Sequence, residues 1–143
     1  MEVSSPAFHL NGKIPEKYTC NGKDVSPPLY INDIPPGTES LAIIVEDPDA
    51  PKGTWTHWIV WNIDPKYEIE EGQIPGIEGL NDFGKYHYGG PCPPWGTHRY
   101  FFKVFALKKR LEIDQNSKKE DLLKAMKGQV LATAELIGVY ESG

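Results

Sequence analysis

The pattern of apolar and polar positions predicts three long β-strands, over residues 40–47, 55–62 and 99–107. In the first, the odd-numbered positions from Leu41 to Asp47 share one face and the even-numbered positions share the other, because side chains alternate along a strand. Both faces of this strand are apolar along most of its length, and a carboxylate residue lies at its end. The pattern therefore predicts a buried strand that carries a polar group at its end.

The second strand is apolar on both faces, which is typical of a strand with neighbours on either side. One face is expected to carry Trp55, His57, Ile59 and Trp61, and the other Trp58 and Val60. If the first two strands pair as antiparallel neighbours, Asp47 leaves one strand and His57 enters the next at the same end of the sheet.

The third strand follows a loop rich in glycine and proline, residues 88–96. Glycine lets backbone N–H groups approach a ligand closely, and proline restricts φ and so lowers the entropic cost of an ordered loop. His98 and Tyr100 are two residues apart and are expected to share one face of the strand. These features predict a preformed pocket wall, although a rigid turn without a ligand is an equally good interpretation of such a loop by itself.

Shorter elements are expected before the third strand. Residues 2–8 are predicted to form a first strand and residues 28–32 a short edge strand, since a proline begins the second of these segments. Residues 64–87 contain prolines and glycines with little periodicity, so they are predicted to be a long excursion with at most brief strands.

The C-terminal third is expected to contain a helix and one further element. A helix is predicted over residues 118–127, with Ser117 as N-cap and Glu120 at N3 of a capping box. For residues 129–140 the periodicity permits helix or strand, and the β-branched side chains favour a strand.

Composition narrows the class of protein. The chain has 143 residues, of which 39% are hydrophobic and 24% charged, so residues 1–143 are expected to form one globular domain. Its 13 prolines and 14 glycines are scattered along the chain, which indicates short segments with frequent turns and a mostly β fold. The formal net charge of −5 disfavours nucleic-acid binding.

Localisation and redox state follow from further details. The N-terminus has neither a basic n-region nor an apolar h-region, and the longest aliphatic run, residues 41–45, is too short to span a bilayer. We therefore expect a cytoplasmic protein without membrane insertion. With no secretion signal, two reduced thiols at Cys20 and Cys92 are favoured over a disulfide.

The polar residues near the strand ends indicate a binding site. Asp47, Asp49, His57 and His98 stand out against the apolar background, with Tyr100 adjacent. A carboxylate that accepts from one imidazole nitrogen fixes the tautomer and leaves the other nitrogen for a ligand. Together with backbone N–H groups at Gly90 and Cys92, these groups predict a site for a small anion such as phosphate.

Two enzymatic interpretations stay open beside the binding site. Two histidines and one carboxylate could form the facial triad of a non-haem iron centre, and Asp and His could act as general base and acid. No activated nucleophile is evident, however, because the chain lacks a Gly-x-Ser-x-Gly motif and Cys92 lies between prolines. We therefore expect no catalysis, no cofactor and no metal.

Several motifs resemble one protein family over nearly the whole chain. They are Asp47-Pro48-Asp49-Ala50-Pro51, Trp55-Thr56-His57-Trp58, Gly89-Gly90-Pro91-Cys92-Pro93-Pro94 and Gly96-Thr97-His98-Arg99-Tyr100. The chain resembles the phosphatidylethanolamine-binding protein family, and in particular its bacterial and archaeal Raf-kinase-inhibitor-like branch. The resemblance implies a large antiparallel sheet packed on a smaller sheet, a helix near the C-terminus and an anion pocket at one end.

The resemblance also implies residue roles. By position, the pocket residues are Asp47, Pro51, His57, Gly90, His98 and Tyr100, with Trp55 as an apolar wall, and the peptide bond before Pro51 is cis. Eukaryotic relatives bind phosphorylated head groups and inhibit kinases or proteases. Where they carry a His-His pair this chain has Thr56 and His57, a departure that argues against kinase regulation and lipid binding.

These arguments predict a cytoplasmic protein that binds a phosphate-like anion or a phosphorylated head group, with a regulatory role. The predicted ligand-binding residues are Asp47, Pro51, Trp55, His57, Gly90, Cys92, His98 and Tyr100. The alternatives are an inhibitor that docks a kinase or protease through the pocket rim and residues 64–87, and a hydrolase or metal enzyme that uses Asp and His. A homodimer also stays open.

Overall fold

The computed structural model describes residues 1–142, and most of its regular structure is β-strand. In chain order the elements are β1 (Glu2–Ser4), the short 3-10 helix η1 (Glu16–Tyr18), β2 (Leu29–Asn32), β3 (Ser40–Asp47), β4 (Trp55–Ile63), β5 (Glu68–Ile69), β6 (Ile77–Glu78), β7 (Thr97–Leu107), α1 (Lys119–Met126) and β8 (Val130–Glu141).

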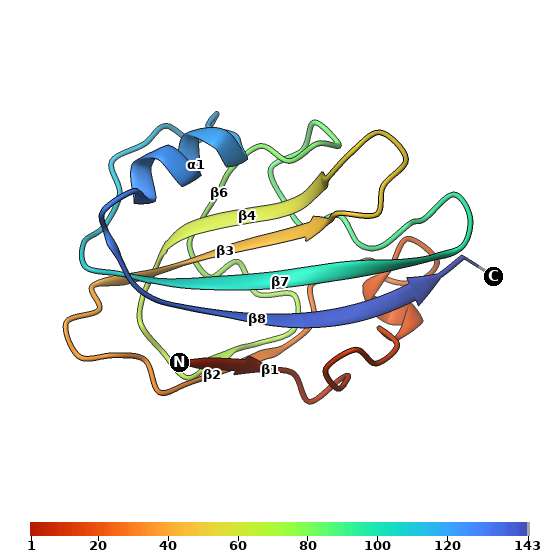
Figure 1. Ribbon diagram of the computed structural model, residues 1–143, viewed down its shortest axis with the longest axis horizontal. Helices are drawn as coiled ribbons and strands as arrows, with labels where there is room; N and C mark the ends of the chain where they lie inside the picture. The colour runs from red at the N-terminus through yellow and green to blue at the C-terminus, as the bar shows by residue number, and fades with distance from the viewer. Residues whose placement is uncertain (143) are drawn as a thin grey trace.

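The strands form two antiparallel sheets (Figure 1). The larger sheet has five strands in the order β6-β4-β3-β7-β8, and the smaller has three in the order β1-β2-β5. Every pairing within them is antiparallel. The prediction of a mostly β protein with a larger and a smaller antiparallel sheet and one helix is therefore confirmed.

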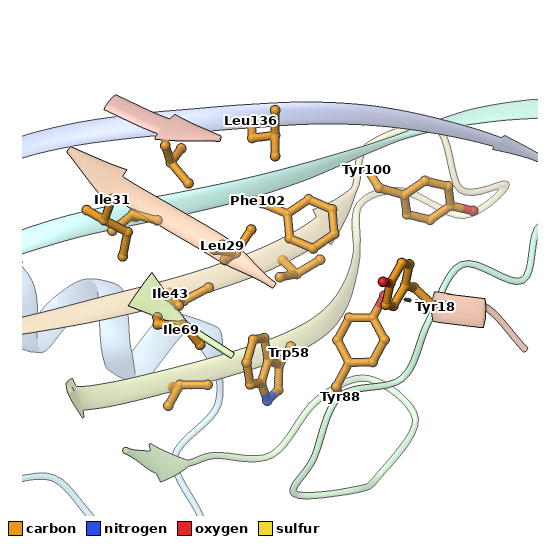
Figure 2. Packing of buried hydrophobic residues seen from close by; sticks show 14 of the residues in the cluster. Tyr18, Leu29, Ile31, Ile43, Trp58, Ile69, Tyr88, Tyr100, Phe102 and Leu136 are labelled. Atoms are coloured by element: carbon orange, nitrogen blue, oxygen red, sulfur yellow. Dashed lines mark hydrogen bonds between the residues drawn. The ribbon is translucent and has the colours of Figure 1, made fainter. Parts of the chain in front are cut away.

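The main core lies between the two sheets. Leu41, Ile43 and Val45 on the inner face of β3 pack in one cluster with Leu29 and Ile31 of the smaller sheet. Figure 2 shows this cluster, with Trp58 of β4 and Phe102 of β7 inside it. Complete burial of each large apolar side chain contributes about 1.5–3 kcal/mol to stability. Packing between their inner faces therefore holds the two sheets together.

The opposite face of β3 is also apolar, and α1 covers it. Ala42 and Ile44 pack with Trp61 of β4 and with Leu122 and Met126 of the helix. This second cluster explains why both faces of β3 and β4 carry hydrocarbon, and it confirms that β4 is a central strand, between β3 and β6.

Three predicted element details are wrong. The first strand, expected over residues 2–8, ends at Ser4. Residues 28–32 were expected at a sheet edge, but β2 lies between β1 and β5 in the smaller sheet. Ser117 is not the helix N-cap: α1 begins one residue later, and the N–H of the N-cap Lys118 donates to Oδ2 of Asp121 at 3.0 Å. Ser117 is buried instead, and its backbone bonds to Asp114 and Leu80.

Other predicted elements are confirmed. Residues 64–87 contain only the two-residue strands β5 and β6, as expected of a long excursion. The segment for which helix and strand were both open is β8, a 12-residue strand that pairs with β7 along its length. In the part of the chain described, no helix is long and apolar enough to cross a membrane.

The expectation of two reduced thiols is wrong. Cys20 and Cys92 form a disulfide across 72 residues of sequence. The two segments also meet through a backbone hydrogen bond from the Cys20 N–H to the Pro91 carbonyl at 3.1 Å. Proximity in the fold brings the thiols together, and sequence spacing alone carries no sign of it.

Candidate functional site

A bulge in β4 places His57 at the site. Val45 of β3 lies opposite Trp58, whereas the next residue, Glu46, lies opposite Thr56, so His57 is an extra residue in β4. Bulges of this kind re-aim a side chain and commonly lie near functional sites. His57 therefore shares a face with Tyr100, with ring centroids 5.3 Å apart, and not with Ile59 and Trp61 as simple alternation predicts.

The pair Asp47 and His98 lies on the same face, from the neighbouring strands β3 and β7. Oδ2 of Asp47 and Nδ1 of His98 are 2.6 Å apart. Oδ1 of Asp47 accepts the backbone N–H of Asp49 at 2.7 Å. Because both carboxylate oxygens accept a hydrogen bond, the charge is well solvated by the protein although the residue is only 3% exposed.

The tautomer of His57 follows from its partner. Nδ1 lies 2.6 Å from the carbonyl oxygen of Gly89, which only accepts, so Nδ1 carries the proton and Nε2 is the remaining acceptor of the neutral ring. Burial lowers the pKa of His57, against the opposing effect of the Gly89 carbonyl and the Asp47 charge. At neutral pH the ring is therefore uncharged.

The hydroxyl of Tyr100 has no hydrogen-bond partner among residues 1–142, although the side chain is 1% exposed. Figure 2 shows Tyr100 at one end of the core, beyond Phe102 on β7. Burial, and then the charge of Asp47, raise the pKa of the phenol. Tyr100 is thus a protonated, buried donor, and a buried polar group without a partner costs about 1–3 kcal/mol.

The glycine and proline loop is fixed to the sheet on its upstream side. The N–H of Gly89 donates to the carbonyl of His57, and the N–H of Gly90 donates to Oδ1 of Asp24 at 2.7 Å. The Tyr88 hydroxyl donates to the carbonyl of Tyr18 at 2.8 Å. These contacts, with the disulfide, hold the loop against the end of the larger sheet.

These groups surround one cavity of about 170 Å³. It is lined by Asp47, Ala50, Pro51, Trp55, His57, Phe83, Cys92, Pro93, Pro94, His98 and Tyr100. Seven of the eight predicted site residues therefore meet there. The exception is Gly90, whose N–H is taken by Asp24 and which does not line the cavity.

Other expectations about this region need correction. Asp49 does not line the cavity: it makes three hydrogen bonds with Arg99, which lower its pKa to about 2. The peptide bond before Pro51 is trans, so the cis bond implied by the family resemblance is wrong. Among residues 1–142, no group of three or more His, Cys, Asp and Glu side chains is placed to hold a metal ion.

Four lining residues were not among the predicted site residues: Ala50, Phe83, Pro93 and Pro94. Of these, Phe83, together with Asn81 beside it, comes from a segment where no site residue was expected. Phe83 belongs to the long excursion, lies 5.1 Å from the ring of His57 and 5.6 Å from that of Trp55, and closes one side of the cavity. Asn81 holds the same excursion, because its Nδ2 donates to the carbonyls of His57 and His87. No local pattern marks either residue, since both act through contacts with distant segments.

The outer face of the larger sheet carries a different, larger hollow of about 470 Å³. It is lined by Lys103, Phe105, Thr133, Ala134 and Glu135. It contains neither histidine nor a buried polar group, so the smaller cavity is the better candidate for a specific site.

Comparison with known proteins identifies the family. The family model described as phosphatidylethanolamine-binding protein matches residues 4–141. A protein named UPF0098 protein in Methanothermobacter thermautotrophicus is 46% identical over 151 residues, and the match covers the whole of both chains.

Two solved structures have the same fold. The phosphatidylethanolamine-binding protein homologue CT736 of Chlamydia trachomatis is 45% identical, with a TM-score of 0.96 over 99% of this chain and 97% of the other. E. coli YbcL, described as a member of the mammalian PEBP family, is 34% identical, with a TM-score of 0.91 over 99% and 98% of the two chains. The predicted family is confirmed: the chain belongs to the phosphatidylethanolamine-binding protein family.

Proposed function

We propose that the cavity binds a small anion with a phosphate-like or carboxylate group, and that the protein acts as a binding protein without catalysing a reaction. The observation that carries the proposal is the convergence of three buried polar side chains, His57, His98 and Tyr100, on one cavity. In both histidines Nδ1 is engaged by an acceptor of the protein, which leaves Nε2 as the second ring nitrogen. The phenol adds a donor.

The protonation of His57 defines which anions suit the site. Its neutral ring offers an acceptor at Nε2, so an anion that carries its own proton, such as a monoprotonated phosphate, can donate to it. A fully ionised anion has to bind with uptake of a proton by the ring, which then offers a donor. Proton uptake also balances the charge of Asp47.

The size of the cavity limits the ligand. A volume of about 170 Å³ holds roughly five or six water-sized groups, which corresponds to a phosphate with a short substituent. The mouth is apolar, because Trp55 and Phe83 are 38% and 41% exposed there. A phosphate ester with a small organic group therefore matches the cavity better than inorganic phosphate, and the phosphorylated head group in the family's description belongs to this class.

Titration of phosphate against the imidazole NMR signals tests the proposal. The chain has four histidines, and the exposed His9 and His87 serve as internal controls because neither lines the cavity. We expect the His57 and His98 signals to shift at millimolar phosphate and those of the controls to stay. Unchanged signals at all four positions would refute the anion site.

A matched pair of variants adds a second test. Asp47→Asn removes the carboxylate that accepts from His98 and is expected to weaken phosphate binding at least about tenfold, the order of one charge-assisted hydrogen bond. Glu46→Gln removes the same charge from the adjacent residue, which bonds Lys103 and Lys119 outside the cavity, and is expected to bind phosphate normally. Equal affinities of the two variants would contradict the assigned role of Asp47.

Comparison of phosphate with sulfate tests the protonation argument. Sulfate has no proton to donate near neutral pH, so its binding requires a protonated ring. Its affinity is expected to fall as pH rises above the pKa of His57 in the unliganded protein and to level off above the pKa in the complex. Phosphate is expected to show a weaker dependence over the same interval, and identical pH profiles would refute this chemistry.

A further inference from the structure

The disulfide lies at the rim of the proposed site. Cys92 lines the cavity, whereas Cys20 does not, and both cysteines are exposed. The bond therefore joins the wall of the cavity to the segment after η1, and a small thiol in solution can reach it. Exposed disulfides are the ones most often labile or regulatory.

The backbone hydrogen bonds that anchor the glycine and proline loop all lie on the N-terminal side of Cys92. Upstream, Gly89, Gly90 and Pro91 are each bonded to another segment through their backbone. From Cys92 to Gly96, no hydrogen bond to the rest of residues 1–142 is present, and Pro93 alone among these five residues is buried. The next residue along the chain with a hydrogen bond to another segment is Thr97 of β7, which pairs with Glu141 of β8.

The disulfide is therefore the main fixed point of the wall segment, residues 92–96. Three members of this segment, Cys92, Pro93 and Pro94, line the cavity. If the bond is broken, the segment keeps its two ends but loses the anchor next to the cavity. Ordering of a freed residue costs free energy, and the cost for even one residue corresponds to about a tenfold change in affinity.

We propose that the Cys20–Cys92 bond is a thiol–disulfide exchange site that sets the affinity of the cavity for its anion, with the oxidised form binding tightly and the reduced form weakly. This inference rests on the proposed function, because it concerns the occupancy of the same cavity. The chemical partner is a dithiol reductant. Both cysteines are exposed residues, so that partner approaches the bond from solvent.

The exchange balances without a further reactant. A thiolate of the dithiol attacks one sulfur of the bond and forms a mixed disulfide, releasing the other cysteine as a thiolate that takes up a proton. The second thiol of the reductant then attacks the mixed disulfide, so the reductant leaves as a cyclic disulfide. Two electrons pass to the protein, and Cys20 and Cys92 become thiols.

The test compares phosphate affinity in the two redox states of the full chain. Phosphate is titrated against oxidised protein and against protein treated with dithiothreitol, with thiols counted by alkylation and mass measurement. We expect affinity to fall at least about tenfold on reduction and to recover on reoxidation. A Cys20→Ser/Cys92→Ser variant is expected to bind like the reduced form and to ignore the reductant.

Three results would overturn the inference. They are a bond that resists dithiothreitol in the folded protein, equal phosphate affinity in the two states, and loss of the near-ultraviolet circular dichroism signal on reduction. The last result would mean that the bond holds the whole fold and does not regulate one wall.

A separate readout distinguishes failure of this inference from failure of the proposed function. If oxidised protein does not bind phosphate, the proposed function fails, and cleavage by chymotrypsin after the exposed Trp95 still reports on the wall. Faster cleavage on reduction, with the rest of the chain intact, would support the redox control of this segment. Unchanged cleavage would refute it.

Discussion

Two buried tyrosines allow a test of the unpaired donor in the cavity. The hydroxyl of Tyr100 has no partner among residues 1–142, whereas that of Tyr88 donates to the Tyr18 carbonyl at 2.8 Å. Both side chains are buried, at 1% and 6% exposure. Replacement of each by phenylalanine removes one oxygen atom and keeps the ring.

The two variants are expected to change stability in opposite directions. Tyr100→Phe removes a buried hydroxyl that lacks a hydrogen bond and is expected to raise the free energy of unfolding by about 1 kcal/mol, from a range of about 1–3 kcal/mol for such a group. The ring contacts with His57 and His98 are retained. Tyr88→Phe leaves the Tyr18 carbonyl without its donor and is expected to lower the free energy of unfolding by about 1–2 kcal/mol.

Urea unfolding at pH 7.5 without phosphate measures both changes in the free energy of unfolding. In a thermal unfolding experiment, 1 kcal/mol corresponds to a shift of about 4 °C in Tm for a chain of this size. In the same samples, Tyr100→Phe is expected to weaken phosphate binding, because it removes a donor from the cavity. A loss of stability in Tyr100→Phe as large as in Tyr88→Phe would show that the hydroxyl is paired in solution and would refute the reasoning.

Two further predictions concern stability. In urea unfolding, the free energy of unfolding of the Cys20→Ser/Cys92→Ser variant is expected to be up to about 4 kcal/mol lower, because the bond closes a loop across 72 residues. A free energy of unfolding equal to that of oxidised wild type would contradict this. Burial lowers the pKa of His57, so the unfolded state binds more protons once pH falls below about 6.5, the usual value for histidine. The contribution of neutral His57 to stability is therefore fully present above about pH 6.5. As the pH drops below this value, the free energy of unfolding decreases, by at most about 1.4 kcal/mol per pH unit for one proton. A His57→Asn variant measured at pH 7.5 and 5.5 should have a flatter profile than wild type, and equal profiles would exclude His57 as the source.

Alternation of apolar residues along the chain was sufficient to predict β3, β4 and β7, because each strand is buried by its neighbours and the period of two is a local property. It also placed Asp47 and His98 at the ends of strands. The motifs around these residues indicated the family, and the family supplied the two-sheet arrangement. Most of the fold and most of the residues around the cavity could therefore be predicted before any coordinates.

Tertiary structure decided the details that depend on pairing between distant segments. The bulge that aims His57 into the cavity is defined by the register of β4 against β3, which the sequence of β4 alone does not encode. Two contacts join residues more than 60 positions apart: the disulfide, and the hydrogen bond from the Gly90 amide to Asp24. No local sequence pattern predicts either of them. The local sequence determines which side chains are available at each strand end, and cross-strand register and long-range contacts decide which of them share the cavity.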